Sequence, residues 1–391
     1  MPIAAEVSVP MRALLAGARR KESALLALTQ ELVRAESPSD EKATVDACAA
    51  IAAAHAQRLG GRVKLHRQKN FGDLLEARFG PKSKTGAAGR TLLLGHLDTV
   101  WPLGTLKTMP CRLGDGRLWG PGALDMKAGV AMALTAIEIL VEAGALDQEI
   151  ILLLVSDEEV GSPASRTTTE RLAAECSQVY VLEPALGLAC KTARKGTGNW
   201  RIEVSGVAAH AGVDFEKGAS AILELSCVIA KVSGWSDLKR GVTVSVGLAG
   251  GGTKSNVIPS EAWAAVDVRI PRKADGPRME RKFAALKPVD KRCKIVVTGG
   301  INRPPMERTR GTVRLYRQAR LLAAELGFAL EEAQTGGASD GNFTSALGIA
   351  TLDGLGAVGE GAHASHESIL LEHLAPRTAL LAGLLAGLLT R

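Results

Sequence analysis

The segment HLDTV at residues 96–100 places a histidine and an aspartate two positions apart. It follows the run TLLLG, which is apolar throughout, as strands buried on both faces require. Side chains at i and i+2 of an extended segment point the same way, so one of His96 and Asp98 can bind a metal while the other orients a group behind it. On its own this pair is weak evidence for a metal site.

Three consecutive carboxylates, Asp157, Glu158 and Glu159, follow the apolar run EIILLLV. A run of charged residues is usually the solvated tip of a loop. The end of a buried strand is a different environment, because like charges repel one another there unless cations neutralise them. A pair of divalent metal ions would supply that positive charge.

Further candidate ligands lie in three other segments. Asp125 stands in WGPGALDMKAG, where it could equally cap a helix, and Glu183 ends the strand-like run VYVLEP. GEGAHASHES contains His363 and His366. Judged alone, each of these histidines is more often a surface or core residue than a ligand.

Together these residues form a set of nitrogen and oxygen ligands without sulfur, at the expected strand ends of one sheet: His96, Asp98, Asp125, Glu158, Glu159, Glu183 and His363. Imidazole with carboxylate suits a hydrolytic zinc site, for which Mn²⁺ or Co²⁺ can substitute. Two histidines and three carboxylates can hold two metals about 3.5 to 4 Å apart only if one carboxylate bridges them. One acid then remains free as a general base.

The elements that must position these side chains alternate between strands and helices. Strand-like runs occupy residues 62–66, 73–79, 91–98, 149–159 and 179–184, and helical patterns occupy 127–144 and 167–175. This alternation predicts an α/β fold with a mostly parallel sheet flanked by helices, in which ligands bind at the carboxyl ends of the strands. Residues 11–59 carry two further helical patterns separated by ESPSDE, and Ser39 or Asp40 can cap the second.

From about residue 196 to residue 303 the pattern changes to the order β-α-β-β-α-β, which is that of a ferredoxin-like sandwich. After it, α/β alternation resumes with a helix, a strand, the loop GGASDGN at 336–342, another strand and a terminal helix. We therefore expect a catalytic domain in two parts, 1–195 and 305–391. A smaller α+β domain, 196–304, is inserted between them.

Composition and charge exclude several classes of partner. The 391 residues carry 48 Lys and Arg against 41 Asp and Glu, a net charge of +7, but the basic residues are interspersed with acids. Only 3% of the residues are aromatic, which leaves little stacking surface for nucleic acid, so no nucleic-acid partner is expected. The apolar run TALLAGLLAGLL at 378–389 is too short to span a bilayer, so no membrane partner is expected and we predict a buried terminal helix.

The six cysteines are scattered, without a C-x-x-C pair. This argues against a disulfide framework and against a thiolate zinc site. The first residues also lack the basic-then-apolar order of a secretory signal. Both observations favour a reducing, cytoplasmic location.

The motifs HLDTV, GPGALDMKAG, SDEEVGS, LEP, AAHAGV and GAHASHE resemble, in this order, the motif series of the co-catalytic zinc exopeptidase and deacylase family. That family includes bacterial glutamate carboxypeptidase, acetylornithine deacetylase and succinyl-diaminopimelate desuccinylase. The resemblance covers essentially the whole chain, and the bacterial glutamate carboxypeptidase branch is the most similar. It implies a zinc-exopeptidase-like catalytic domain whose inserted domain serves as a lid and as a dimerisation surface.

The resemblance also implies a role for each ligand-type residue. His96 and Glu183 would hold one zinc ion, Glu159 and His363 the other, and Asp125 would bridge them. Asp98 would orient His96 from behind. Glu158 would be the base that takes a proton from the metal-bridging water and hands it to the leaving nitrogen. His363 is preferred to His366 because it meets the family's H-x-x-x-E spacing with Glu367.

For the lid, the resemblance implies contacts with the substrate. His210 would stabilise the oxyanion, often across a dimer interface in this family. Asn256, Arg269 and Arg303 could hold substrate oxygens, and Arg303 matches the position of an arginine that binds the carboxylate of the released amino acid. Arg269 is the one of the three most often merely structural. Gly336 and Gly337 resemble the family's glycine loop beside the pocket.

The function that these observations predict is that of a dizinc metallohydrolase with a small-molecule N-acyl amino acid or short peptide as substrate. It would cleave the amide bond and release a C-terminal, acidic amino acid. The alternative is an N-acyl-amino-acid deacylase of the acetylornithine deacetylase type with the same metal centre. A metal-free binding protein would require the loss of ligands, and the sequence has lost none. The lid helix ASAILELSCVIAKV, apolar on more than one face, predicts a homodimer through the lid.

Overall fold

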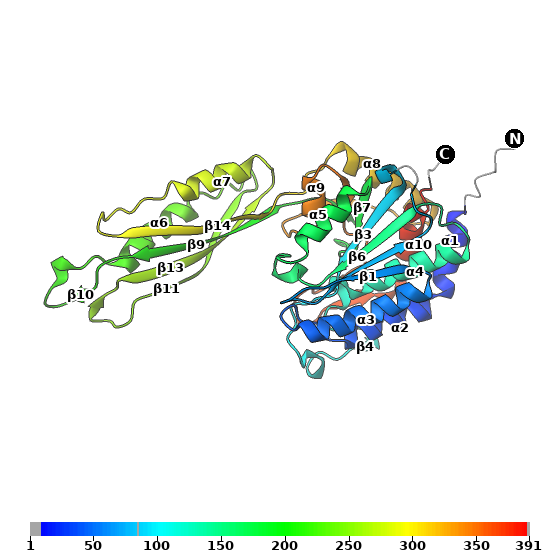
Figure 1. Cartoon of the computed structure of the whole chain (residues 1–391), viewed down its shortest axis with the longest axis horizontal. Helices are drawn as coiled ribbons and strands as arrows, with labels where there is room; N and C mark the ends of the chain where they lie inside the picture. The colour runs from blue at the N-terminus through cyan, green and yellow to red at the C-terminus, as the bar shows by residue number, and fades with distance from the viewer. Residues whose placement is uncertain (1–8, 84–85, 389–391) are drawn as a thin grey trace. The chain divides into compact units, whose positions relative to one another are not determined.

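Figure 1 shows the computed structural model of the chain, in which residues 9–83 and 86–388 are described. The described residues form two compact units. The first contains residues up to 193, residues 308–334 and the residues from 339 onward, and the second contains residues 194–307 and 335–338. Each unit has its own main sheet and its own apolar core.

A six-stranded sheet forms the centre of the first unit. Its strands follow the order β1 (Arg62–His66), β2 (Leu74–Phe79), β6 (Glu149–Val155), β3 (Arg90–His96), β7 (Gln178–Val181) and β16 (Ala350–Leu352). β6, β3, β7 and β16 are parallel, β2 is antiparallel to β6, and β1 is antiparallel to β2. The mostly parallel sheet predicted from the sequence is therefore confirmed, with β2 running against the other strands.

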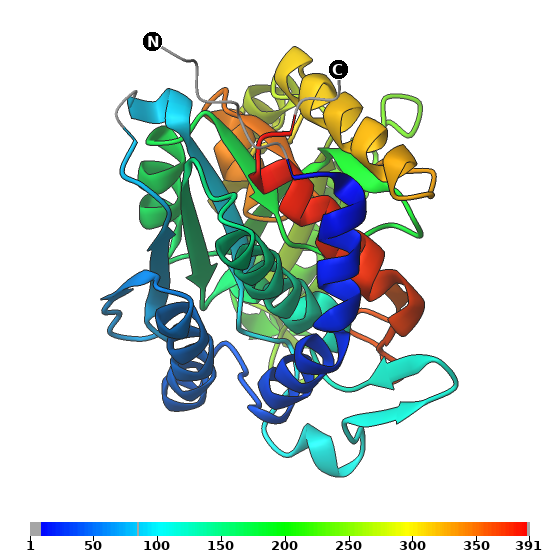
Figure 2. The same ribbon diagram turned by 90° about the vertical axis from the view of Figure 1, so that its right-hand side faces the viewer.

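Helices cover both faces of this sheet. They are α1 (Met11–Arg20), α2 (Glu22–Arg34), α3 (Lys42–Arg58), α4 (Ala128–Glu142), α5 (Arg166–Ala174), α8 (Arg310–Glu325), α9 (Gly341–Ala346) and α10 (Leu374–Leu385). Figure 2 shows α1, α4 and α10 packed against one another, and they contribute to the larger apolar core. The helix α5 contributes to a second core on the other face.

The strand β3 is buried on both faces, which explains its unbroken apolar sequence. Leu93 packs into the larger core together with Leu152 of β6. Leu92 and Leu94 pack into the other core together with Leu172 of α5. A strand between two helical layers needs apolar residues at every position, so the period of two is lost.

The N-terminal helices differ from the prediction. Residues 11–59 contain three helices instead of two, because the first pattern ends at Arg20 and a new helix begins at Glu22. Between them, the Lys21 ammonium lies 2.8 Å from Glu138 and 2.6 Å from Glu142 of α4, contacts that the local pattern does not reveal.

The predicted cap of the next helix is also wrong. The helix α3 begins at Lys42, and the residue before it, Glu41, makes no side-chain cap bond. Ser39 instead donates its hydroxyl to Asp98, 59 residues away in the chain. A long-range partner therefore replaces the local one.

The C-terminal helix is buried, as predicted, but its bounds differ. It begins at Leu374 instead of Thr378, because Pro376 lies in its first turn, where a missing amide removes no helical hydrogen bond. Leu389, the predicted end, lies outside the described residues. The predicted loop GGASDGN is shorter than expected, since α9 begins at Gly341.

A small sheet that the sequence analysis did not foresee joins two distant loops of the first unit. Its strands follow the order β17 (Gly359–Glu360), β18 (Ser368–Leu370), β5 (Arg117–Trp119) and β4 (Arg112–Gly114). In the pairing of β18 with β5, Ser368 lies opposite Trp119. The loops that contain Asp125 and His363 are therefore adjacent, because each is attached to one of these paired strands.

The second unit is an antiparallel sheet with two helices. Along the chain it contains β9 (Gly196–Ser205), α6 (Ala221–Ser233), β11 (Thr243–Gly251), β13 (Glu261–Ile270), α7 (Asp275–Ala284) and β14 (Lys294–Arg303), with the short pair β10 (Ala209–His210) and β12 (Val257–Ile258). The sheet order β11-β13-β9-β14 is that of a ferredoxin-like sandwich.

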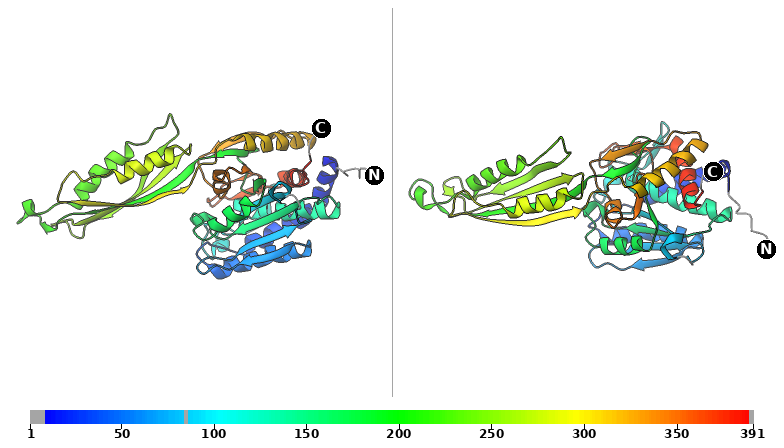
Figure 3. Two further views of the ribbon diagram at one scale, coloured as in Figure 1. Left: turned by 45° about the horizontal axis from the view of Figure 1, so that its top comes forward. Right: turned by 90° about the horizontal axis from the view of Figure 1, so that it is seen from above.

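One face of this second sheet is covered, as Figure 3 shows. Leu225 of α6 and Phe283 of α7 belong to the same core as Trp200 and Ile202 of β9, whereas Arg201 on the opposite face is exposed. The Trp200 and Phe283 rings stack with their centroids 4.3 Å apart. Among the described residues of the whole chain, no helix has the length and apolarity needed to cross a bilayer.

Candidate metal centre

Two histidines share one aspartate at the carboxyl edge of the central sheet. His96 Nε2 lies 3.2 Å from Asp125 Oδ1, and His363 Nε2 lies 3.4 Å from Asp125 Oδ2. Each oxygen of Asp125 therefore faces a different imidazole. The chain supplies the three residues from the end of β3, from the loop before α4 and from the loop between β17 and β18.

Three glutamates complete the cluster. His96 Nε2 is 3.7 Å from Glu183 Oε1, and His363 Nε2 is 3.2 Å from Glu159 Oε2. Candidate ligand atoms form two groups, and within each group the atoms lie within 4.8 Å of one another. One group comes from His96, Asp125 and Glu159, and the other from His96, Glu158 and Glu183. The geometry thus places Glu158, expected as the base, as close to His96 as a ligand would be.

The register of the central strands creates this arrangement. His96 lies opposite Val155 in the parallel pairing of β3 with β6, so the residues after both strands leave the sheet side by side. Asp98 Oδ1 accepts the backbone N–H of Glu158 at 3.2 Å, and its Oδ2 accepts that of Glu159 at 3.1 Å. Asp98 therefore holds the peptide that presents both glutamates.

Asp98 also lies against His96, although its carboxylate is not the closest group. His96 Nδ1 is 3.0 Å from the backbone oxygen of Asp98 and 3.5 Å from Asp98 Oδ1. With Nδ1 protonated towards that carbonyl, Nε2 is the nitrogen that points at Asp125 and Glu183. Sequence reasoning anticipated the pairing of these two residues but not the contact of Asp98 with the peptide of residues 158–159.

The electrostatics of the cluster favour added positive charge. Burial lowers the pKa of His96, but the hydrogen bonds that its imidazole donates to Asp125 and Asp98 outweigh burial and raise the pKa well above 6.5. Hydrogen bonds that the imidazole of His363 donates to Asp125 and Glu159 raise its pKa to about 10. Burial raises the pKa of Glu159, and its buried Oε1 has no hydrogen-bond partner among the described residues. Imidazoles that retain protons among carboxylates mark a position that suits divalent cations, so the residues fit a metal pair.

The loop that carries His363 distinguishes it from His366. His363 has a φ of 61°, a left-handed conformation that is uncommon outside glycine. Both histidines are exposed, but only His363 has its Nε2 within ion-pair distance of Asp125 and Glu159 among the described residues, at 3.4 and 3.2 Å. The structure therefore brings His363, and not His366, to the carboxylates.

The turn before Asp125 requires glycine at one position. Gly122 has a φ of 70°, and a Cβ atom there would lie 2.5 Å from the side chain of Thr99. The peptide bond between Asp125 and Met126 is cis. Asp125 does not cap a helix, which was the alternative interpretation of its position, because its own carboxylate faces the histidines.

The predicted residues of the second unit form a separate group. His210 on β10 is exposed, and its Nδ1 accepts the backbone N–H of Gly212 at 3.1 Å. The backbone oxygen of Asn256 accepts the N–H of Ala211, and Asn256 directly precedes β12, where Val257 pairs with His210 of β10. Their roles toward a substrate stay predictions.

The two predicted arginines of this unit differ in environment. Arg269 makes two hydrogen bonds of 2.8 Å to the carboxylate of Asp267, so its guanidinium is already neutralised. Arg303, at the end of β14, is buried opposite Thr197 of β9. Of the two, Arg303 is in the environment where a charged group must be matched by another charge or by hydrogen bonds.

Gly336 and Gly337 are exposed, and nothing in the fold requires glycine there. Neither has a positive φ, and a Cβ atom at Gly336 would meet no atom within 4 Å. At Gly337 the nearest atom would be a nitrogen of Arg194 at 4.0 Å. The approach of a substrate therefore stays the predicted reason for these glycines.

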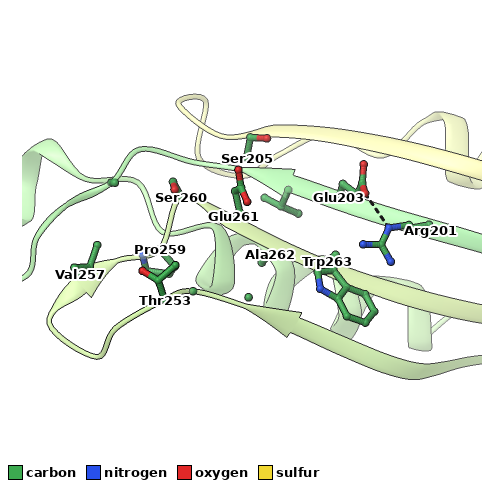
Figure 4. Close-up of a pocket in the computed structure, with 14 residues that line it drawn as sticks. Arg201, Glu203, Ser205, Thr253, Val257, Pro259, Ser260, Glu261, Ala262 and Trp263 are labelled. Atoms are coloured by element: carbon green, nitrogen blue, oxygen red, sulfur yellow. Dashed lines mark hydrogen bonds and ion pairs between the residues drawn. The ribbon is translucent and has the colours of Figure 1, made fainter.

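A hollow of about 580 Å³ on the second unit contains none of the predicted site residues (Figure 4). It lies on the open face of the sheet, where Arg201 pairs with Glu203 at 2.8 Å and its guanidinium carbon stacks 4.4 Å from the centroid of the Trp263 ring. Arg201 is thus paired within the hollow itself. The metal-type cluster lies in the other unit, so the hollow is not the candidate site.

Two buried residues near the cluster had no assigned role in the sequence analysis. Ser39 donates a hydrogen bond of 2.7 Å to Asp98, and Glu367 accepts hydrogen bonds from the loop that contains Asp125. The only sequence signal for Glu367 was its distance of four residues from His363. The position of Ser39 before a helical pattern indicated a helix cap instead.

Comparison with known proteins identifies a family whose model matches this chain. Residues 92–387 match the model of peptidase family M20/M25/M40. Carboxypeptidase G2 of Pseudomonas sp. (strain RS-16) is 28% identical over 351 residues, which are 88% of this chain and 84% of that protein. Succinyl-diaminopimelate desuccinylase of Stenotrophomonas maltophilia (strain R551-3) is 29% identical over 378 residues, 90% of this chain and 96% of that one.

Solved structures share the fold. Aminopeptidase PepT of Bacillus cereus ATCC 10987 superposes with a TM-score of 0.78 at 22% sequence identity, and the match covers 93% of this chain and 98% of that one. At this level of identity the match speaks for the fold alone. It spans both units of the chain.

Proposed function

Because the chain belongs to peptidase family M20/M25/M40 and is a metal-dependent hydrolase, we propose that it cleaves the amide bond of an N-acyl or peptidyl amino acid and releases the C-terminal amino acid. The observation that carries the proposal is the carboxylate of Asp125, which faces His96 with one oxygen and His363 with the other. Such an arrangement suits a carboxylate that bridges two metal ions.

We propose zinc as the metal, with two ions per chain. His96 and Glu183 would hold one, His363 and Glu159 the other, and Asp125 would bridge; the absence of sulfur from the cluster suits Zn²⁺, Co²⁺ or Mn²⁺. When bound, such ions polarise the scissile carbonyl and lower the pKa of a bound water. Glu158, whose N–H is fixed by Asp98, would take the proton of the attacking water at its carboxylate and deliver it to the leaving nitrogen.

The second unit would supply substrate contacts. Arg303 would bind the carboxylate of the released amino acid, because a guanidinium matches a carboxylate with two parallel hydrogen bonds. His210 would donate a hydrogen bond to the oxyanion, and Asn256 with Gly336 and Gly337 would contact the substrate. The similarity to Carboxypeptidase G2 supports release of a C-terminal amino acid, and the resemblance of the motifs to the glutamate carboxypeptidase branch implies that this amino acid is acidic.

A second candidate function is that of a deacylase. It is favoured by the similarity to succinyl-diaminopimelate desuccinylase, which extends over nearly the full length of both proteins. The metal centre would be the same, and the enzyme would recognise mainly the acyl half of its substrate. The two candidates therefore differ in which half of the substrate the chain contacts.

We further propose a homodimer formed through the second unit. On α6, Ile222 is 45% exposed and Leu223 is 66% exposed, and Leu248 on the edge strand β11 is 64% exposed. An exposed sheet edge beside apolar side chains is a surface that a second copy can cover.

The six cysteines form no disulfide, which supports the proposed cytoplasmic location.

A substrate panel with matched variants tests the proposed function. Metal content is measured first, and activity is then followed on N-acyl amino acids in which the acyl half, the amino-acid half and the free carboxylate are varied one at a time. We expect about two divalent metals per chain, loss of activity on chelation, and a preference for a free carboxylate that Arg303→Ala removes. Arg292→Ala, a surface arginine of the same unit that pairs with Asp290, is the control.

Three results would count against the proposal. Full activity in a metal-free preparation would exclude the metal centre. Unchanged kcat/KM of Arg303→Ala on N-acyl glutamate, with the same preference over the amide, would favour the deacylase. An active preparation that sediments only as a monomer would exclude the dimer.

A further inference from the structure

Glu367 is a carboxylate buried at the end of the loop that contains His363. Its side chain is 1% exposed, and the strand β18 begins at the next residue. Burying a charged carboxylate is unfavourable unless hydrogen bonds replace its hydration.

The donors come from the loop of Asp125. Glu367 Oε1 accepts the backbone N–H of Leu124 at 2.9 Å and that of Asp125 at 3.0 Å. Its Oε2 accepts the N–H of Gly122 at 3.0 Å and the indole N–H of Trp101 at 2.8 Å. One carboxylate therefore binds three amides of a four-residue stretch, and the last of them belongs to Asp125 itself.

These contacts connect the two loops that carry cluster residues. Glu367 follows His363 by four residues, and its own backbone oxygen accepts the N–H of Gly120 at 3.3 Å. A shift of its side chain would rotate the peptide of Asp125, and with it a carboxylate whose two oxygens face two different histidines. The position of Asp125 relative to His363 thus depends on Glu367.

We propose that Glu367 is a positioning residue that fixes the carboxylate of Asp125 between the two metal ions. This rests on the proposed dinuclear centre. The geometry requires an acceptor at both oxygens: a glutamine would present an NH₂ group to two N–H donors in either orientation, and an aspartate would withdraw its carboxylate by about one bond length. Groups behind metal ligands typically change metal affinity or activity by about 10- to 100-fold when they are lost.

Co²⁺ binding tests this proposal directly, because its visible absorption reports the coordination of the metal as well as its occupancy. Parent protein, Glu367→Gln and Glu367→Asp are stripped of metal and titrated with Co²⁺, and urea unfolding is measured on the same samples. We expect both variants to bind the second Co²⁺ at least tenfold more weakly than the parent, with an altered absorption band. Turnover should fall mainly in kcat and should recover in part with excess metal.

Glu224→Gln is the matched control. Glu224 is also buried and also accepts two backbone N–H groups, those of Val289 and Asp290, but it lies in the second unit. This variant should lose stability and keep the parent's Co²⁺ affinity and spectrum. It separates the loss of a buried carboxylate from the loss of one behind Asp125.

The outcomes distinguish this proposal from the proposed function. A parent protein that binds no pair of Co²⁺ ions would exclude the dinuclear centre itself. A parent that binds two, together with a Glu367 variant that folds and keeps the parent's affinity and spectrum, would overturn the positioning role and leave the function intact. A lower urea midpoint with unchanged Co²⁺ binding would likewise reduce Glu367 to a structural residue. Should Glu367→Gln not fold, Glu367→Asp decides by the same criteria.

Discussion

Replacing Asp98 with asparagine should weaken the metal centre through the peptide of residues 158–159. Asp98 is fully buried and accepts three hydrogen bonds, from the N–H of Glu158, the N–H of Glu159 and the hydroxyl of Ser39. The two amides face different oxygens. An asparagine can keep one of them in either orientation, and its NH₂ group then faces the other.

The expected magnitude follows from these contacts. A buried N–H that loses its acceptor costs about 1 to 3 kcal/mol, and the bonds that remain lose the benefit of a charged acceptor. We therefore expect Asp98→Asn to lower the free energy of unfolding by about 2 to 4 kcal/mol. Because the affected peptide carries Glu158 and Glu159, metal affinity should fall by about 10- to 100-fold.

Urea unfolding of metal-stripped protein and titration with Zn²⁺ measure the two effects separately. Ser39→Ala is the matched control, because it removes the hydroxyl bond to Asp98 and leaves both amides paired. This control should lose part of the stability and keep the metal affinity within about threefold. The reasoning is refuted if Asp98→Asn binds Zn²⁺ as tightly as the parent, or if Ser39→Ala weakens metal binding as much as Asp98→Asn does.

Three further predictions concern the roles of Glu158 and Glu159, the titration of His363, and a buried arginine of α10. Glu158→Gln should keep both metals and lose about 10²- to 10⁴-fold in kcat, whereas Glu159→Gln should lose metal in elemental analysis; the reverse pattern would exchange the two roles. The pKa of His363, raised to about 10 by Asp125 and Glu159, lies above its usual 6.5, so its stabilisation of metal-stripped protein is complete below about pH 6.5 and is lost as the pH rises toward 10. The urea midpoint should therefore fall as the pH rises over that range. If the urea midpoint of His363→Gln fell with pH in the same way, the dependence would not come from His363. Arg377→Met should lower the free energy of unfolding by about 2 to 5 kcal/mol, because the buried guanidinium donates to the carbonyls of Gly354 and Gly356; a change below about 1 kcal/mol would show that water replaces it.

The strand ends of the central sheet could be predicted because their sequences are unambiguous. Runs such as TLLLG and EIILLLV are apolar at every position, which occurs when a strand lies between two helical layers. The polar residues that follow them then mark the carboxyl edge. His96, Glu159 and Glu183 could be grouped on this basis, without knowledge of the order in which the strands pair.

The contacts behind these residues could not be predicted, because each partner is distant in the chain and ordinary in its local pattern. Ser39 precedes a helix and looks like a cap, yet its hydroxyl bonds to Asp98. Glu367 lies more than 240 residues along the chain from Leu124 and Asp125, whose backbone N–H groups donate to its carboxylate. Strands of two or three residues, such as β17 and β5, have no periodicity that a sequence can reveal.

The apolar side chains of β3 determine the chemistry at its end. Leu92 and Leu94 pack into one core and Leu93 packs into the other. A shift of the strand by one residue would move each leucine to the opposite face of the sheet, where it does not fit. This register places His96 opposite Val155, and the chain then brings Asp98 to the amides of Glu158 and Glu159. A slip of one position would turn the side chain of His96 to the other face of the sheet, away from Asp125. The ligand cluster therefore depends on how the leucines pack. A substitution such as Leu93→Asn should weaken metal binding, although Leu93 is an apolar core residue and not a ligand.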